Sequence, residues 1–220
     1  MAGVAVGPEI QTYDFPGGSS GEGTHTRPQQ SMGEVILRTR GGDDSFEAPF
    51  DPDTFRQVLG HHAAGVVVIT AATVEPVGFT ATSFTSVSLY PPIVSFCVGR
   101  GSSSWSAMTS TAYLGVNLLS DGQADIARLF ATRGADRFAA PVDWDADAYG
   151  VPVLDGVLAS MICRRLHSVE VGDHAITLAE PLTGTHRVAA DRSPLLYHRG
   201  RYTALVASAA APLEGAHHGP

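Results

Sequence analysis

The residues best suited to chemistry are small hydroxyl side chains that gather between positions 78 and 92. Thr80, Thr82, Ser83 and Ser86 alternate with aromatic and aliphatic residues, and Pro91-Pro92 ends the run. A strand of this kind presents hydroxyls and backbone N–H groups beside apolar anchors, which suits a flat ligand with polar edges. The same alternation is typical of an ordinary antiparallel strand with one wet face, and periodicity alone favours that commoner structure.

A second candidate follows directly, where an apolar run at 93–98 leads into a loop of glycine and serine. Gly99 and Gly101 let the backbone approach a ligand closely, and Ser102–Ser104 supply hydroxyls at the start of a predicted helix. Unpaired N–H groups at a helix start attract anions, so the loop is a candidate phosphate site. Such loops are also ordinary helix caps, and the motifs of P-loop and dinucleotide-binding folds are missing.

Cysteine and histidine provide neither a disulfide framework nor a metal site. Cys97 and Cys163 each lie in an apolar, strand-like run, so we expect two buried thiols. His61 and His62 are adjacent and point in different directions, and no carboxylate or third histidine follows at ligand spacing. We therefore predict no bound metal.

Composition excludes several classes of protein. The 220 residues carry a formal net charge of -8, which argues against a nucleic-acid partner because such a partner needs a basic surface. No apolar run reaches the length of a membrane span, and the first residues lack the features of a signal peptide. These observations predict a cytoplasmic protein without a membrane partner.

The elements that must position these residues are mostly strands. We expect a mostly disordered tail at 1–48, one domain at 49–207 and a flexible tail at 208–220, with a brief strand possible at 35–37. Asp51 caps a helix that ends near Gly60, and Asp121 caps a second that ends before Gly134. Further predicted elements are strands at 63–72, 78–92, 93–98, 113–119, 158–166, 169–171, 174–188 and 195–206, a short helix at 105–108, a turn at 172–173 and a loop at 136–156. Many strands without a βαβ series favour a closed antiparallel barrel.

The two candidate segments, 78–92 and 93–105, resemble the short-chain flavin reductases, which supply reduced flavin to two-component monooxygenases. The resemblance extends in the same order through 55–60, 65–70, 115–120, 136–138, 172–174 and 194–197, and it covers most of 50–206. It implies a mainly β fold with a few short helices, the antiparallel split β-barrel of this family.

The resemblance also implies roles for individual residues. Thr80, Ala81, Thr82, Ser83 and Phe84 would lie along the flavin ring, with Ser86 also at the flavin, and Cys97, Val98, Gly99, Ser102, Ser103, Ser104 and Trp105 would hold its ribityl-phosphate end. His174 would position the nicotinamide. His198, Arg199, Arg201 and Tyr202 would form a second nicotinamide-side loop whose arginines pair with the NADH pyrophosphate, and Phe138 would cover the site.

Each of these roles has an ordinary structural alternative. His174 is also explained as a turn histidine with a backbone partner, 198–202 as a solvated hairpin, and Phe138 as a packing residue at a helix end.

The resemblance predicts an NAD(P)H:flavin oxidoreductase, with NADH favoured, that reduces FAD or FMN for a separate flavin-dependent monooxygenase. It also implies a homodimer. Departures from the family pattern at 61–64, Thr82 and Tyr90 leave the choice between FAD and FMN open. One alternative is a non-catalytic flavin-binding carrier or partner subunit. Another, an oxidase of the pyridoxamine-phosphate kind, requires more basic residues than Ser102–Ser104 supply.

Overall fold

The computed structural model describes residues 50–139, 141–186 and 192–205. The predicted tails at 1–48 and 208–220, and the brief strand at 35–37, lie outside these residues. The first element is helix α1 (Pro52–Gly60), where the Asp51 carboxylate accepts a hydrogen bond of 2.8 Å from the Thr54 N–H and proline occupies the first turn. The predicted first helix is therefore confirmed, with its predicted cap.

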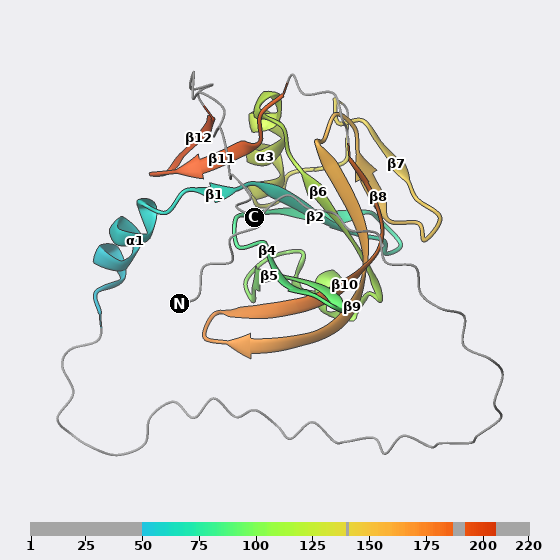
Figure 1. Ribbon diagram of the computed structural model, residues 1–220, viewed down its shortest axis with the longest axis horizontal. Helices are drawn as coiled ribbons and strands as arrows, with labels where there is room; N and C mark the ends of the chain where they lie inside the picture. The colour runs from blue at the N-terminus through green and yellow to red at the C-terminus, as the bar shows by residue number, and fades with distance from the viewer. Residues whose placement is uncertain (1–49, 140, 187–191, 206–220) are drawn as a thin grey trace, which may run out of the picture. The chain divides into compact units, whose positions relative to one another are not determined.

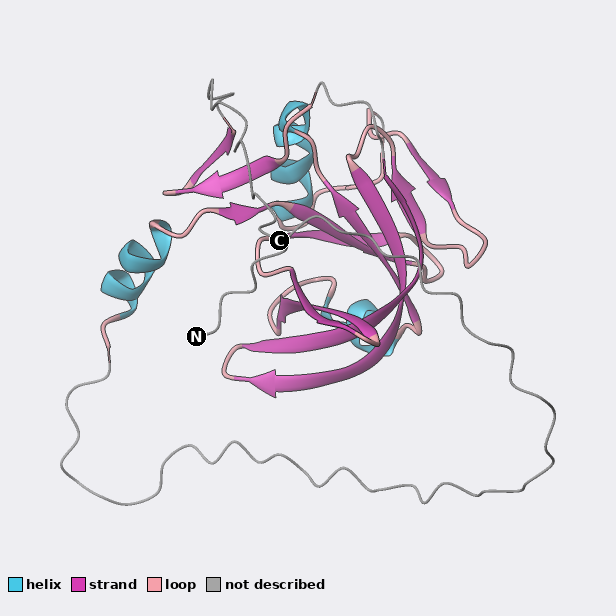
Figure 2. Ribbon diagram, in the orientation of Figure 1, coloured by secondary structure: helices cyan, strands magenta, loops and turns pink. Residues whose placement is uncertain are grey.

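Seven strands form one antiparallel sheet in the order β3-β2-β6-β9-β10-β5-β4. Their bounds are β2 Val67–Ala71, β3 Val77–Ala81, β4 Thr85–Leu89, β5 Pro92–Gly99, β6 Tyr113–Leu118, β9 Ala159–Val171 and β10 His174–His186. Strands β3 and β4 are at opposite edges of the sheet, yet only residues 82–84 join them. Four Cα steps span at most roughly 14 Å, so the sheet must curl until its edges approach each other. Figures 1 and 2 show this curled sheet, and it confirms the split antiparallel barrel.

The prediction of one strand over 78–92 is wrong. The chain leaves the sheet after Ala81 and enters the opposite edge at Thr85. Strand β3 is largely buried, whereas β4 is exposed along most of its length. The alternating pattern of the sequence continues across the break, so periodicity does not reveal it.

The predicted strand at 63–72 is likewise divided. Strand β1 (Ala64–Gly65) pairs with β11 (Leu195–His198), which pairs with β12 (Arg201–Ala204), and this three-stranded sheet is separate from β2. The turn between β11 and β12 contains Arg199 with φ of 47° and Gly200 with φ of 76°. Two positive φ values in succession are typical of a tight hairpin turn.

Two further predictions need correction. A 3-10 helix, η1 (Asp121–Gln123), precedes α3 (Ala124–Ala131), and Ser120 caps η1 in place of Asp121, because Ser120 and Gln123 form a reciprocal capping box. The predicted loop at 136–156 contains a small hairpin of β7 (Trp144–Ala146) and β8 (Pro152–Leu154). Strands of three residues are too short to produce a recognisable period.

Among the residues that the structure describes, the core consists of two clusters of buried apolar residues. Phe96, Met108 and Leu114 belong to the first cluster, and the second includes Phe130 of α3 together with Leu195. Helix α2 (Trp105–Ser110) confirms the short helix predicted at 105–108, and it contributes Met108 to the core.

The two cysteines are free thiols that differ in burial. Cys163 is fully buried, and this burial raises the pKa of its thiol to about 12. Cys97 is only half-buried, so the prediction of two core thiols holds for one of them.

No helix among the described residues is long and apolar enough to cross a membrane. Within the same residues, no three His, Cys, Asp or Glu side chains lie close enough together to hold a metal ion.

Candidate functional site

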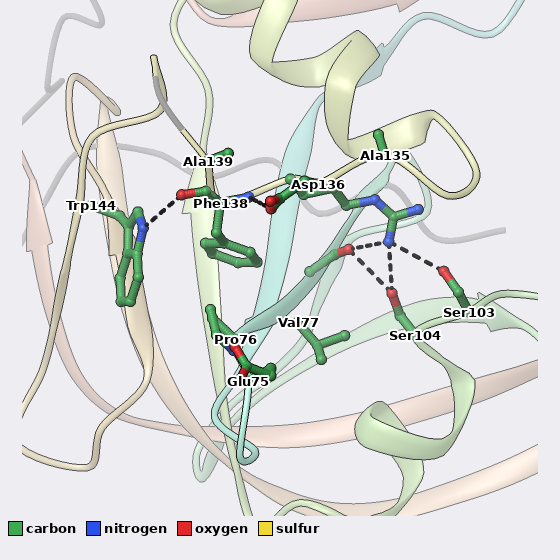
Figure 3. Close-up of a pocket in the computed structure, with 12 residues that line it drawn as sticks. Glu75, Pro76, Val77, Ser103, Ser104, Ala135, Asp136, Phe138, Ala139 and Trp144 are labelled. Atoms are coloured by element: carbon green, nitrogen blue, oxygen red, sulfur yellow. Dashed lines mark hydrogen bonds between the residues drawn. The ribbon is translucent and has the colours of Figure 1, made fainter.

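The serine loop lies beside a hollow of about 530 Å³, here called the serine hollow. Ser103 and Ser104 lie on one side of it, and Phe138 and Trp144 lie on the other (Figure 3). The remaining lining residues are Glu75, Pro76, Val77, Gly78, Ala135, Asp136, Arg137 and Ala139. The start of β3, the start of α2 and the segment after α3 therefore meet at one place.

The three serines of the loop are arranged differently from one another. Ser104 is fully buried, and its hydroxyl donates to the Gly78 carbonyl at 3.1 Å, so it makes no side-chain cap at the start of α2. The Ser102 hydroxyl accepts from the Ser104 N–H at 3.2 Å. Ser103 is exposed. Of the three hydroxyls proposed for the phosphate end, that of Ser103 is the most open to a ligand.

Arg137 is a residue of this hollow that the sequence analysis did not assign. Its Nη1 donates to the Gly78 carbonyl at 2.7 Å and to the hydroxyl oxygens of Ser104 at 3.1 Å and Ser103 at 3.5 Å, all three drawn as dashed lines in Figure 3. Its Nη2 donates to the Thr132 carbonyl at 2.9 Å. The motif at 136–138 was the signal that could have identified it.

The position of Phe138 is compatible with both predicted roles, packing at a helix end and covering the site. Its ring packs edge-on against Phe130 with centroids 5.2 Å apart, and against Trp144 at 5.4 Å. The Trp144 indole also donates to the Phe138 carbonyl at 3.4 Å. Phe138 thus packs at the end of α3 and also lines the hollow.

The residues predicted along the flavin ring divide between the interior and the surface. The Thr80 hydroxyl donates to the Ala127 carbonyl of α3 at 2.7 Å and is not free for a ligand, and Ala81 is buried. Thr82 and Ser83 are exposed, and the Ser83 hydroxyl accepts from the Cys97 N–H at 2.8 Å. Phe84 is half-buried against the core, and Ser86 is exposed on β4. Only 82–84 and 86 therefore offer side chains to a ligand.

Thr82 and Ser83 line a second hollow of about 590 Å³, here called the hairpin hollow. Phe55, Leu59 and Tyr197 supply apolar walls, and the other lining residues are Arg56, Gly60, His62, Ala64, Arg199 and Gly200. The Arg199 N–H donates to the Gly60 carbonyl at 2.9 Å, and its Nη2 lies 3.1 Å from His61 Nδ1. These contacts join the β11–β12 hairpin to the end of α1.

Arg201 and Tyr202 line a third hollow of about 630 Å³ together with Arg128. The Arg128 guanidinium lies over the Tyr202 ring, 5.4 Å from its centroid. Burial, and then the nearby Tyr197, raise the pKa of Tyr202. Arg199 and Arg201 therefore line different hollows, whereas the sequence analysis had both arginines pair with one pyrophosphate. Arg199 lies in the turn itself, with φ of 47°, whereas Arg201 is the first residue of β12.

His174 follows the turn between β9 and β10, where Gly172 has φ of 59°. Its imidazole Nδ1 lies 2.7 Å from the Asp173 carboxylate, and this hydrogen bond together with the histidine charge lowers the pKa of Asp173. The partner of the ring is therefore a side chain and not the backbone. His174 pairs with Gly99, so it lies at the end of β5, just before the serine loop. Two residues predicted to hold the ribityl-phosphate end lie elsewhere: Val98 is buried in the core, and Trp105 packs against that core.

The curled antiparallel sheet, with a three-stranded sheet beside it, defines the class of split β-barrels. The model of the flavin reductase like domain matches residues 59–206, and the chain belongs to this family.

Two relatives have names that describe their activities. The reductase subunit HsaB of a flavin-dependent monooxygenase from Mycobacterium tuberculosis is 36% identical over 72% of this chain and 84% of its own. An NADH:FMN oxidoreductase from Rhodococcus qingshengii is 41% identical over 67% of this chain and 79% of its own.

Solved structures show the same similarity. The NADH:FAD oxidoreductase SgcE6 of Streptomyces globisporus C-1027, in complex with NAD and FAD fragments, aligns with a TM-score of 0.68 and 36% identity, over 74% of this chain and 100% of its own. Component B of a nitrilotriacetate monooxygenase from Mycobacterium thermoresistibile aligns with a TM-score of 0.69 and 34% identity, over 74% and 91% of the two chains.

Proposed function

We propose that this chain is an NAD(P)H-dependent flavin reductase that reduces FAD or FMN and supplies the reduced flavin to a partner monooxygenase. The observation that carries the proposal is the family match over 59–206, because those residues line the serine hollow, the hollow of Arg201 and all of the hairpin hollow except Phe55 and Arg56. Relatives named as NADH-dependent flavin oxidoreductases favour NADH as the electron donor.

The proposed flavin contacts are made by exposed residues that line the serine hollow and the hairpin hollow. The exposed residues Thr82 and Ser83 would offer backbone N–H groups to the edge of the ring, and the serine hollow would offer the Ser103 hydroxyl and an aromatic wall to the ribityl-phosphate end. Bound flavin supplies the ring that accepts a hydride from the nicotinamide, so the chain needs no nucleophile and acts by orienting the two molecules. The serine hollow offers hydroxyl donors and one arginine to a phosphorylated ligand, and the carboxylates of Glu75 and Asp136 also line it.

The nicotinamide contacts are assigned to His174 and the hairpin. His174 is about half exposed, and its contact with Asp173 fixes the orientation of the ring. Arg199 is the arginine on the side of Thr82 and Ser83, so it is the better placed of the two to meet the phosphates of the dinucleotide.

We further propose that the protein is a homodimer in the cytoplasm. Strand β4 is an edge strand whose Val87, Leu89 and following Tyr90 are 53%, 71% and 89% exposed, and α1 exposes Phe55, Val58 and Leu59. Apolar surface of this extent supports an interface with a second copy. Two free thiols suit a reducing compartment.

The test is the consumption of NADH by purified protein in air with a catalytic amount of FAD or FMN. We expect NADH absorbance to fall far faster than with the same flavin alone. Flavin binding without consumption of NADH would instead support a carrier or partner subunit. Analytical sedimentation of the full chain measures its molecular mass and so tests the dimer. The mass of a monomer at all concentrations would exclude a dimer.

A further inference from the structure

Arg137 is a partly buried cation without a counter-charge among the described residues. No carboxylate oxygen of those residues lies within 4.0 Å of its guanidinium nitrogens. Its Nε is buried and has no hydrogen-bond partner in the part of the chain that the structure describes. Burying a charge is costly unless an opposite charge or strong hydrogen bonds compensate it, and four neutral oxygens compensate this one only in part.

The arginine also lines an open hollow, so an anion can reach it. Within residues 50–139, 141–186 and 192–205, Nη2 makes one hydrogen bond, to the Thr132 carbonyl, and its second N–H has no acceptor. The Ser103 hydroxyl oxygen accepts from Nη1 at 3.5 Å, and within the described part of the chain its own proton has no acceptor. Two donors, one of them charged, therefore belong to residues that line the serine hollow.

We propose that Arg137 supplies the positive charge that binds the phosphate of the flavin, with the Ser103 hydroxyl as a second donor. This inference rests on the proposed function and assigns the charged partner of that ligand. Arginine forms its strongest hydrogen bonds with phosphate and carboxylate oxygens. Because Nη1 also holds the Gly78 carbonyl and the Ser104 hydroxyl, the cation stays in place when the hollow is empty.

The experiment compares three flavins that share one ring system. Riboflavin has no phosphate, FMN has one and FAD has two, so the difference between riboflavin and FMN isolates the phosphate. Binding to the full chain is measured by flavin fluorescence without NADH, for the unmodified protein and for Arg137→Ala, Ser103→Ala and Arg133→Ala. Arg133 is exposed and makes no hydrogen bond among the described residues, so it controls for the loss of one positive charge.

We expect Arg137→Ala to raise the Kd for FMN roughly tenfold or more and to change the Kd for riboflavin less than about twofold. Ser103→Ala should raise the Kd for FMN about threefold, and Arg133→Ala should leave both constants within about twofold. Equal losses for FMN and riboflavin in Arg137→Ala would assign the arginine to structure alone and overturn the proposal. Unchanged binding of FMN would overturn it as well.

Two further measurements keep the test decisive. Should Arg137→Ala fail to fold, the variant Arg137→Lys and the effect of salt on binding replace it. Added salt should weaken the binding of FMN but not that of riboflavin. Equal responses of the two flavins to salt would contradict the proposal. Turnover of NADH is measured separately. Flavin binding that depends on Arg137 without NADH consumption would sink the reductase function and leave this site standing.

Discussion

The imidazole of His174 lies directly against Gly99: the two residues are partners across β10 and β5, and a β-carbon added at Gly99 would lie 3.5 Å from His174 Nε2. The histidine is thus fixed beside the strand that leads to the serine loop. Its other nitrogen is held by Asp173.

Replacing His174 tests its assignment to the nicotinamide. His174→Ala should raise the KM for NADH about fivefold or more and change the Kd for FMN less than about twofold, because the side chain is assigned to the electron donor. Steady-state kinetics and flavin fluorescence measure the two constants. Equal losses for both ligands contradict the assignment.

Asp173 should act only through His174. Asp173→Asn keeps the size of the side chain but removes the charge that orients the imidazole. We expect a smaller rise in the KM for NADH than in His174→Ala, and no further rise when both changes are combined. Additive effects would show that Asp173 has a role independent of the histidine.

The two arginines of the hairpin should differ in their effect on NADH. Arg199 shares a hollow with Thr82 and Ser83, whereas Arg201 lies in the hollow of Arg128 and Tyr202. Arg199→Ala should raise the KM for NADH roughly tenfold, and Arg201→Ala, its matched control, less than about twofold. A larger effect from Arg201 would place the dinucleotide in the other hollow.

Gly78 should tolerate no side chain. A β-carbon there would lie 2.7 Å from Phe130 Cε1 and 3.1 Å from the Ile69 carbonyl oxygen, whereas one at Gly65 meets nothing within 4 Å. Gly78→Ala should therefore lower the free energy of unfolding by about 1–3 kcal/mol. Gly65→Ala should change it by less than about 0.5 kcal/mol. Urea unfolding of both variants measures these effects, and equal stabilities would show that the packing around Phe130 is looser than described.

The buried thiol predicts a loss of stability in alkali. Burial raises the pKa of the Cys163 thiol from 9.0 to about 12. The protonated thiol therefore makes its full contribution to the free energy of unfolding below pH 9, and this contribution is lost as the pH rises toward 12. The slope is at most about 1.4 kcal/mol per pH unit. Urea unfolding at several alkaline pH values should show a smaller loss for Cys163→Ala than for the unmodified protein or Cys97→Ala. Parallel losses in all three would assign the alkaline effect to other groups.

The parts of the fold that local chemistry determines were predictable from the sequence. Asp51 with Pro52 defined the start of α1, and the Gly172-Asp173 pair defined the turn between the longest strands. The break between β3 and β4 was not predictable, because it depends on how the sheet closes and not on the residues at 82–84.

In the candidate site, too, local chemistry was predictable from the sequence and contacts between distant elements were not. The sequence identified the segments that border the hollows, yet the Thr80 and Ser104 hydroxyls have inward partners that depend on where α3 and β3 pack. Arg137 donates a hydrogen bond to Ser104 Oγ, although the two residues are 33 positions apart in the sequence. No local sequence pattern reveals such a contact.

The most direct test of the central claim is a titration without oxygen, in which protein and FMN or FAD receive NADH and the visible absorbance of the flavin is followed. Each NADH oxidised should bleach one flavin, at a rate far above that of the same mixture without protein. Bleaching no faster than in the protein-free mixture would contradict the assignment of this chain as a flavin reductase.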